Sequence, residues 1–225
     1  MATVPQELEA HLVLEEALAF PVSSKRLQQL AKRSLDIVLG VAFLALLLIP
    51  ALIVALLIRV DSVGGPLLTQ PRVGKNGRIF RMYKFRTMVD GAHAKISELD
   101  ALNEQTGPIF KMRRDPRVTR LGRWLRKLSI DEVPQLFNVV RGDMSLVGPR
   151  PPLPHEVQSY TRGQLRRLLA RPGLTGLWQV NGRSMLPFEE MVELDVRYIE
   201  DWSLMLDLAI LARTVPAIIL ARGAY

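Results

Sequence analysis

The strongest feature of the hydrophobic pattern is an apolar run from Ile37 to Ile58 that contains no charged residue. Its 22 residues are enough to cross a bilayer core of about 30 Å as a helix. A fully buried core helix is the alternative for such a run. A cleaved signal peptide does not fit, because the run begins late and no small-residue cleavage site closely follows it. We therefore expect a membrane helix over residues 34–60.

Two details of this run bear on how it enters the membrane. Pro50 lies inside it, where a missing N–H and a ring clash can kink the helix. Basic residues also stand on both sides of the run, so the positive-inside rule assigns both of its ends to the cytoplasm. A re-entrant helix-hairpin satisfies that assignment, whereas a spanning helix violates it at one end. Both remain open on these features. The flanking cations are Lys25, Arg26, Lys32, Arg33, Arg59, Arg72, Lys75 and Arg78.

The remaining pattern predicts short elements around this helix. Residues 1–33 combine spaced leucines with many charges and form a helical lead-in or a frayed terminus. Residues 61–88 read as two strands joined by a Gly-Lys-Asn-Gly turn, which is a small β-hairpin. Helical spacing follows at 90–105, 115–129, 132–140 (ending near Gly142), 155–170, 187–200 and 204–220.

These elements favour an α-rich α+β fold, because strands are few and do not alternate with helices as in a doubly wound sheet. The predicted organisation is a lead-in at 1–33, a re-entrant membrane helix at 34–60 and a catalytic domain of amphipathic helices at 61–225, which lies on the membrane.

Composition narrows the chemistry. The chain has no cysteine, which excludes disulfides, thiolate catalysis and cysteine zinc sites, and three scattered histidines make a histidine-rich metal site improbable. A formal charge of +8 suits an anionic partner such as a phosphate, a nucleotide or an acidic membrane.

The acidic pair Asp131-Glu132 is the candidate reaction centre. Locally, Ser129 and Glu132 fit an S-x-x-E capping box, so the pair could be no more than the start of a helix. Phosphate-cradling glycine loops and the G-x-S-x-G elbow are absent. A carboxylate pair among lysines and arginines in a membrane-attached chain suits phosphoryl transfer, where cations stabilise charge and a carboxylate can be the nucleophile.

Two other classes of function compete with an enzyme. Basic residues at intervals of three or four predict a cationic helix face that can grip lipid headgroups, as in a non-enzymatic membrane adaptor. Nucleic-acid binding ranks lower, because the few aromatic residues are not interleaved with the basic ones as a stacking surface requires. We expect no nucleic-acid partner. The basic face consists of Arg113, Arg117, Arg120, Arg123 and Lys127.

Several ordered motifs resemble the bacterial sugar transferases, or monotopic phosphoglycosyl transferases. They are KRSLDI before the apolar run, YKFRTM at 83–88, residues 115–151 with SIDEVPQ and VGPRP, RPGLTGLWQVNGR at 171–183 and ELDVRYIEDW within 193–211. The resemblance covers nearly all of the chain beyond the lead-in. It implies transfer of a sugar 1-phosphate from a UDP-sugar to undecaprenyl phosphate at the cytoplasmic face of the bacterial inner membrane, as the first membrane step in glycan assembly.

The resemblance also implies roles for individual residues. Asp131 would attack the β-phosphorus and form an aspartyl phosphosugar, and Asp131 and Glu132 would hold Mg²⁺. Asp195 matches another acidic position of the family. Arginine offers phosphate a planar fork that lysine lacks. The expected phosphate contacts are Lys84, Arg126, Arg150 and Arg183.

The Pro-rich turn around Arg150 is expected to hold that arginine towards the acid pair. The family's re-entrant helix is broken at a proline, which favours a bend at Pro50, although Ile49 stands where many members have serine. The resemblance leans towards galactose or glucose as the sugar and leaves N-acetylated sugars open. The lead-in and the apolar helices are compatible with a homodimer.

Overall fold

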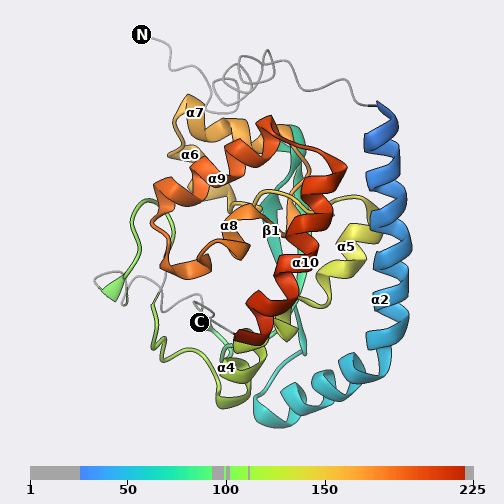
Figure 1. The fold of residues 1–225 in the computed structure, drawn as a ribbon. Helices are drawn as coiled ribbons and strands as arrows, with labels where there is room; N and C mark the ends of the chain where they lie inside the picture. Colours follow the sequence, from blue (N-terminus) through green and yellow to red (C-terminus); the bar gives the residue numbers. More distant parts are fainter. Residues whose placement is uncertain (1–25, 93–98, 100–101, 111, 221–225) are drawn as a thin grey trace, which may run out of the picture.

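The computed structural model describes residues 26–92, 99, 102–110 and 112–220. Most of the predicted lead-in, and most of the predicted helix at 90–105, lie outside the described residues. Within them the protein is rich in helix and has one long apolar helix near its start, as expected. The long helix α2 (Arg26–Asp61) runs along one side of the domain, and the strands lie near the middle (Figure 1).

α2 is the one described helix that is long and apolar enough to cross a membrane. Only 6% of its most apolar window is buried, so the alternative of a core helix of the folded domain is wrong. The helix continues through Pro50, but Figure 1 shows it bent, with its second part turning beneath the domain. The first part packs on the central core through Leu39, Leu44 and Leu47. The second part packs through Ile58 against Phe85 and Leu125.

Three residues just before the apolar run fasten α2 to the domain. Lys32 Nζ lies 2.7 Å from the buried Asp207 carboxylate of α10 (Leu204–Leu220). Both terminal nitrogens of Arg33 donate to the last carbonyls of α5 (Gln135–Arg141), at 2.7 Å each. Asp36 Oδ1 accepts from Ser145 Oγ and from the Leu146 amide. Lys32 and Arg33 therefore bind the protein interior, which removes them from the flanking charges that the positive-inside argument counted.

The predicted β-hairpin is confirmed. Strands β1 (Leu67–Val73) and β2 (Ile79–Phe85) pair antiparallel, with Leu67 opposite Phe85. Their turn is a short 3₁₀ helix, η1 (Lys75–Gly77), in which Asn76 has a φ of 55°. Asparagine tolerates this left-handed conformation, which lets the chain reverse tightly.

A second, parallel pair of strands is too short to leave a pattern in the sequence. β3 (Ser145–Val147) pairs with β4 (Gly173–Thr175). The backbones meet so closely that a Cβ on Gly173 would lie 2.0 Å from the Gly148 nitrogen. Glycine is required there. The contact brings the Pro-rich turn that follows β3 beside the RPGLTG segment.

Three helical predictions need correction. The helix expected from residue 115 begins only at Arg120, as α4 (Arg120–Lys127), because Thr119 caps it by accepting from the Gly122 amide. Arg117 precedes that helix and is buried against Asp115 at 2.7 Å, so it does not belong to a cationic helix face. The other helix-start signal, a capping box at Ser129, is wrong: Ser129 is left-handed and its side chain makes no cap bond.

The third correction concerns the helix expected over 155–170. It is broken into α6 (Pro154–Gln158), α7 (Arg162–Leu165) and the 3₁₀ helix η5 (Arg166–Leu169), because Thr161 and Gln164 form a capping box that starts a new helix. The predictions at the C-terminal end are confirmed by α9 (Phe188–Glu200) and by α10. Gly142, left-handed with a φ of 95°, ends α5 as predicted.

We expect Lys32→Met to destabilise the protein. Asp207 is 1% exposed and would lose the cation that neutralises it, although Tyr198 and Trp202 would still donate to it. Breaking one side of a buried ion pair costs about 3–5 kcal/mol. Thermal unfolding in detergent measures the loss. Lys75→Met, in the exposed hairpin turn, is the matched control, and equal melting temperatures for the two variants would contradict the anchoring role of Lys32.

Candidate active site

The acid pair lies on a one-turn 3₁₀ helix, η4 (Ile130–Glu132), between α4 and α5. Ser129 enters this turn with a φ of 55°, so the chain changes direction just before the two acids. This reversal points the acids towards β2 rather than along a continuous helix. Asp131 is 8% exposed. Glu132 is partly exposed, and its Oε1 lies 2.8 Å from Lys84 Nζ on β2.

Two arginines complete the surroundings of the pair. Arg126, on α4, donates from Nε to Thr87 Oγ1 at 2.9 Å, and its charge lowers the pKa of Asp131. Arg183 comes from the 3₁₀ helix η6 (Arg183–Met185) and donates to Ser129 Oγ at 2.9 Å. Its charge lowers the pKa of Glu132. The structure therefore brings four of the predicted cation and acid positions together around Asp131.

The surroundings of the two acids shift their pKa values in opposite directions. Burial raises the pKa of Asp131 to about 6, with a further increase from Glu132 that Lys84 and Arg126 oppose. Burial acts on Glu132 in the same direction, but the Lys84 ammonium outweighs it and holds the pKa of Glu132 below its ordinary value. Where the surroundings shift the pKa values of two neighbouring carboxylates in opposite directions, the two groups commonly have different chemical roles. Glu132 therefore favours its charged form more strongly than Asp131 does.

A cavity of about 100 Å³ opens on the Glu132 side of the pair. Lys84 and Glu132 line one part of it, and Arg150, from the Pro-rich turn, lines another. Arg150 is gripped by Glu156 in a bidentate ion pair, with distances of 2.8 and 3.1 Å. This ion pair holds the Arg150 side chain, whereas the sequence pattern predicted that the Pro-rich turn would hold it towards the acid pair.

Asp195 lies behind this cavity rather than in its wall. It is completely buried on α9, forms an ion pair with Arg167, and accepts from the Arg150 amide at 3.3 Å. Its place in the structure is that of a support for the Arg150 backbone.

Several residues of the cavity wall were missed in the sequence. Arg72 was counted only as a charge flanking the membrane helix, yet it is buried in the wall. Gln135 follows Glu132 by three residues, a helical spacing that could have drawn attention to it. Trp178, on the short helix α8 (Leu177–Val180), gives no such signal. These three residues come from separate segments, so only the fold brings them together.

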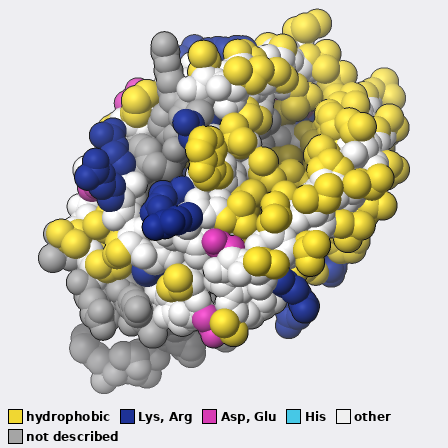
Figure 2. All heavy atoms as spheres, turned by 90° about the horizontal axis from the view of Figure 1, so that it is seen from below, with side chains coloured by type: hydrophobic (Ala, Val, Ile, Leu, Met, Phe, Trp, Pro, Cys, Tyr) yellow, Lys and Arg dark blue, Asp and Glu magenta, His cyan; other side chains and the backbone are white. Residues whose placement is uncertain are grey.

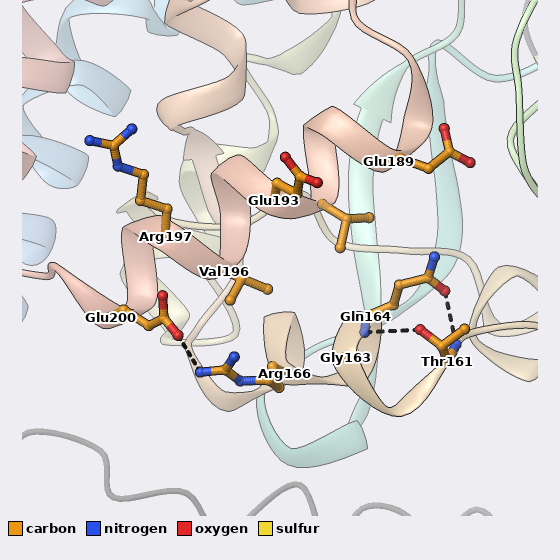
Figure 3. A pocket seen from close by; sticks show the side chains of 10 residues that line it. Thr161, Gly163, Gln164, Arg166, Glu189, Glu193, Val196, Arg197 and Glu200 are labelled. Carbon is orange, nitrogen blue, oxygen red and sulfur yellow. Dashed lines mark hydrogen bonds and ion pairs between the residues drawn. The ribbon is translucent and has the colours of Figure 1, made fainter.

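A larger surface pocket of about 430 Å³ lies elsewhere, between α7 and α9 (Figure 3). Its rim mixes acids and bases, and Arg166 and Glu200 form an ion pair across it. None of the predicted site residues lines it. The smaller cavity beside the acid pair is the one lined by predicted site residues, namely Lys84, Glu132 and Arg150.

The described residues contain no cluster of three or more acidic or histidine side chains. Asp131 and Glu132 are the carboxylates present at the site. Magnesium is commonly held by one or two carboxylates, with water and substrate phosphates completing its octahedron. The donor set therefore fits Mg²⁺ and not a metal that needs a cage of protein ligands.

We expect opposite effects from neutralising the two acids. Because burial raises the pKa of Asp131 above its ordinary 3.8, ionising it lowers folding stability as pH rises from about 4 to about 6. Asp131→Asn should therefore stabilise the protein at pH 7.5, by up to about 3 kcal/mol, and change little near pH 4. Glu132 has a lowered pKa, so its charge stabilises at neutral pH, and Glu132→Gln should be destabilising there. Unfolding of both variants at pH 4 and 7.5 measures this, and destabilisation by Asp131→Asn at pH 7.5 would contradict it.

Comparison with known proteins agrees with this geometry. The family model for bacterial sugar transferases matches residues 27–221. The chain is 44% identical to the galactosyl transferase CpsE of Streptococcus agalactiae over 97% of its length, and 41% identical to the undecaprenyl-phosphate galactose phosphotransferase of Salmonella typhimurium over 90%. It spans about half of these two relatives, 48% and 43%. It is 40% identical to the exopolysaccharide production protein ExoY of Rhizobium meliloti, over 87% of this chain and 88% of ExoY. The chain belongs to the bacterial sugar transferase family.

Proposed function

We propose that this protein transfers a sugar 1-phosphate from a UDP-sugar to undecaprenyl phosphate and releases UMP. The observation that carries the proposal is the buried Asp131, which lies among Lys84, Arg126 and Arg183 beside Glu132, whose pKa is lowered by Lys84. A nucleophilic carboxylate next to concentrated positive charge is suited to attack on a diphosphate. The names of the Salmonella and Streptococcus relatives make galactose the first candidate sugar. A relative from Komagataeibacter xylinus that is named as an undecaprenyl-phosphate glucose phosphotransferase makes glucose the second.

In the proposed first half-reaction, an Asp131 carboxylate oxygen attacks the β-phosphorus of the UDP-sugar. The new O–P bond forms as the bond between that phosphorus and the UMP oxygen breaks, so UMP leaves with the electron pair. An aspartyl phosphosugar remains. In the second half-reaction, an oxygen of undecaprenyl phosphate attacks the same phosphorus. This forms the lipid diphosphosugar and restores the Asp131 carboxylate.

The chain's own residues would support both steps. Arg126 and Lys84 lower the pKa of Asp131 and so favour its reactive, ionised form. Arg183 is held near the acids by Ser129 and presents its charge to the diphosphate. Asp131 and Glu132 would hold Mg²⁺, which when bound supplies a positive charge that neutralises the diphosphate. Glu132 would then exchange part of its contact with Lys84 for the metal.

The main mechanistic rival lets undecaprenyl phosphate attack the UDP-sugar directly, with Asp131 only binding metal. The covalent route predicts that enzyme mixed with UDP-galactose and Mg²⁺, without lipid, releases about one UMP per active site in a rapid burst. Asp131→Asn should abolish the burst, because an amide cannot form the acyl phosphate. Quenched-flow analysis of UMP measures it.

The matched control for this burst is Glu189→Gln, which changes a carboxylate in the surface pocket on α9. It should leave the burst unchanged. If UMP appears only after lipid is added, the direct route is correct and the aspartyl intermediate is not formed. A non-enzymatic adaptor would produce no UMP under either condition.

We also propose that α2 enters the cytoplasmic face of the bacterial inner membrane as a re-entrant helix. The bend near Pro50 and the packing of the second part of α2 against α4 support this arrangement. Figure 2 shows apolar side chains gathered over much of one face of the molecule, with lysines and arginines beside them. Such a surface suits a bilayer interface. The exposed apolar residues include Ile49, Leu52, Leu56, Trp124, Leu128, Met205, Val215 and Ile219.

The topology is open to a direct test because the chain has no cysteine. Single cysteines replacing Gln28 and Val63 mark the two ends of α2, and both positions are exposed. For a re-entrant helix, a membrane-impermeant maleimide should label both from the cytoplasmic side only. Comparison of intact spheroplasts with inside-out vesicles separates the sides. Labelling of the two positions from opposite sides would show a spanning helix instead.

A further inference from the structure

Three buried N–H donors, on residues that line the acid-pair cavity, have no acceptor among the described residues. They are Arg72 Nε, Gln135 Nε2 and Trp178 Nε1. All three residues line the cavity. Arg72 is 8% exposed and Gln135 only 3%, so bulk water does not compensate for the missing acceptors. Leaving one such buried donor unsatisfied costs about 1–3 kcal/mol, which makes three of them at one cavity unusual for a merely structural feature.

Arg72 also forms no ion pair among the described residues, although the charges of Glu156 and Glu132 partly offset the lowering of its pKa. Its terminal nitrogens donate only to neutral acceptors, Gln70 Oε1 at 2.7 Å and the Pro151 carbonyl at 2.8 Å. The neighbouring Arg150 has its own carboxylate, Glu156, which is 1% exposed. Burial, followed by the positive charge of Arg150, lowers the pKa of Arg72 to about 9. A buried cation without an anion is unfavourable until an anion arrives.

The chemistry of the wall specifies the class of that anion. Arg72 and Trp178 can only donate hydrogen bonds at the atoms concerned, and Gln135 offers its amide N–H. A sugar hydroxyl would require acceptors as well as donors. A cavity of about 100 Å³ can accommodate a phosphate group. The carboxylate in the wall, Glu132, is already paired with Lys84.

We propose that Arg72, Gln135 and Trp178 form a phosphate-binding pocket that holds the phosphate group adjacent to the one transferred. Asp131 lies outside the wall of this pocket, so the phosphorus that Asp131 attacks is not the one that the pocket binds. Two phosphates fit this description: that of the leaving UMP and that of the lipid acceptor. The role of the pocket in the reaction rests on the proposed function. Binding of a phosphate in the pocket rests on the residues of the cavity alone.

Equilibrium binding to the full-length protein in nanodiscs tests the pocket without any turnover. The probes are UMP, inorganic phosphate and a short-chain prenyl phosphate, measured by titration calorimetry. Arg72→Gln removes the charge and Nε, and should weaken binding of a phosphate probe at least about tenfold. Gln135→Met removes the unpartnered amide and should weaken it about threefold to tenfold. Arg197→Gln, at an exposed arginine of the surface pocket, should bind as the unaltered protein does.

The pattern of affected probes distinguishes the two sources. Weaker binding of UMP alone assigns the pocket to the leaving group, and weaker binding of the prenyl phosphate alone assigns it to the acceptor. Loss of both supports one pocket that serves the two half-reactions in turn. Unchanged binding of every probe in Gln135→Met and Arg72→Gln would overturn the proposal.

Two variants separate loss of binding from loss of folding or charge. Gln135→Met breaks no bond of the Nε2 group, so this variant should fold and decides the outcome even if Arg72→Gln melts at a much lower temperature. Arg72→Lys, which keeps a charge but loses the planar fork, should bind phosphate with intermediate strength. A protein that binds phosphate through these residues but releases no UMP from any UDP-sugar would reject the proposed function and leave the pocket standing.

Discussion

The burial of charged side chains is the constraint on which the structure depends. A charge removed from water needs a partner of opposite charge or a set of hydrogen-bonding groups. Lys32 neutralises Asp207 and Arg167 neutralises Asp195, and both pairs join segments far apart in the sequence. A third buried acid, Asp36, is held by neutral donors from β3. These contacts fix α2 to α10 and to β3, which precedes the Pro-rich turn, and fix α9 to η5. The arrangement of the site follows from them.

Among the described residues, Asp131 and Arg72 are exceptions to this rule that lie near each other. Asp131 is a buried acid that forms no ion pair, and Arg72 is a buried cation bonded only to neutral acceptors. One responds with a raised pKa and the other with a lowered pKa. Unfavourable groups of this kind persist where binding or reaction relieves them. In the proposed reaction, Asp131 is relieved by forming an acyl phosphate and Arg72 by receiving a phosphate oxygen.

Contacts of the long apolar helix α2 also fix the position of the site. Arg33 holds the end of α5, whose other end begins with Gln135, three residues after Glu132. The second part of α2 packs through Ile58 against Phe85, which ends the strand that carries Lys84. The acid pair is therefore supported from both sides by one apolar helix. A lipid phosphate presented at the membrane surface would approach a site whose position relative to α2 is fixed by these contacts.

The sequence was most informative where local chemistry decides the structure. The Gly-Lys-Asn-Gly turn predicts the hairpin, and Gly142 ends a helix, because backbone conformation at these positions depends on one or two residues. The capping box predicted at Ser129 was wrong, although S-x-x-E fits the local pattern. Glu132 instead pairs with Lys84 of β2, a contact across 48 residues that the local sequence does not indicate. The prediction that Arg117 belongs to a cationic helix face was also wrong. Arg117 is buried in an ion pair with Asp115, and the helix begins only after Thr119.

The acid pair was found from sequence because its two members are adjacent, but the pocket beside it could not be. Arg72, Gln135 and Trp178 come from β1, α5 and α8 and meet only because Gly148 and Gly173 allow two backbones to touch. That close approach also places Arg150 and Glu156 at the same cavity. If a single phosphate pocket serves both half-reactions in turn, the aspartyl phosphosugar of the proposed mechanism would retain the sugar phosphate between the two steps. The proposed pocket and the proposed nucleophilic role of Asp131 would thus both follow from one arrangement of charge.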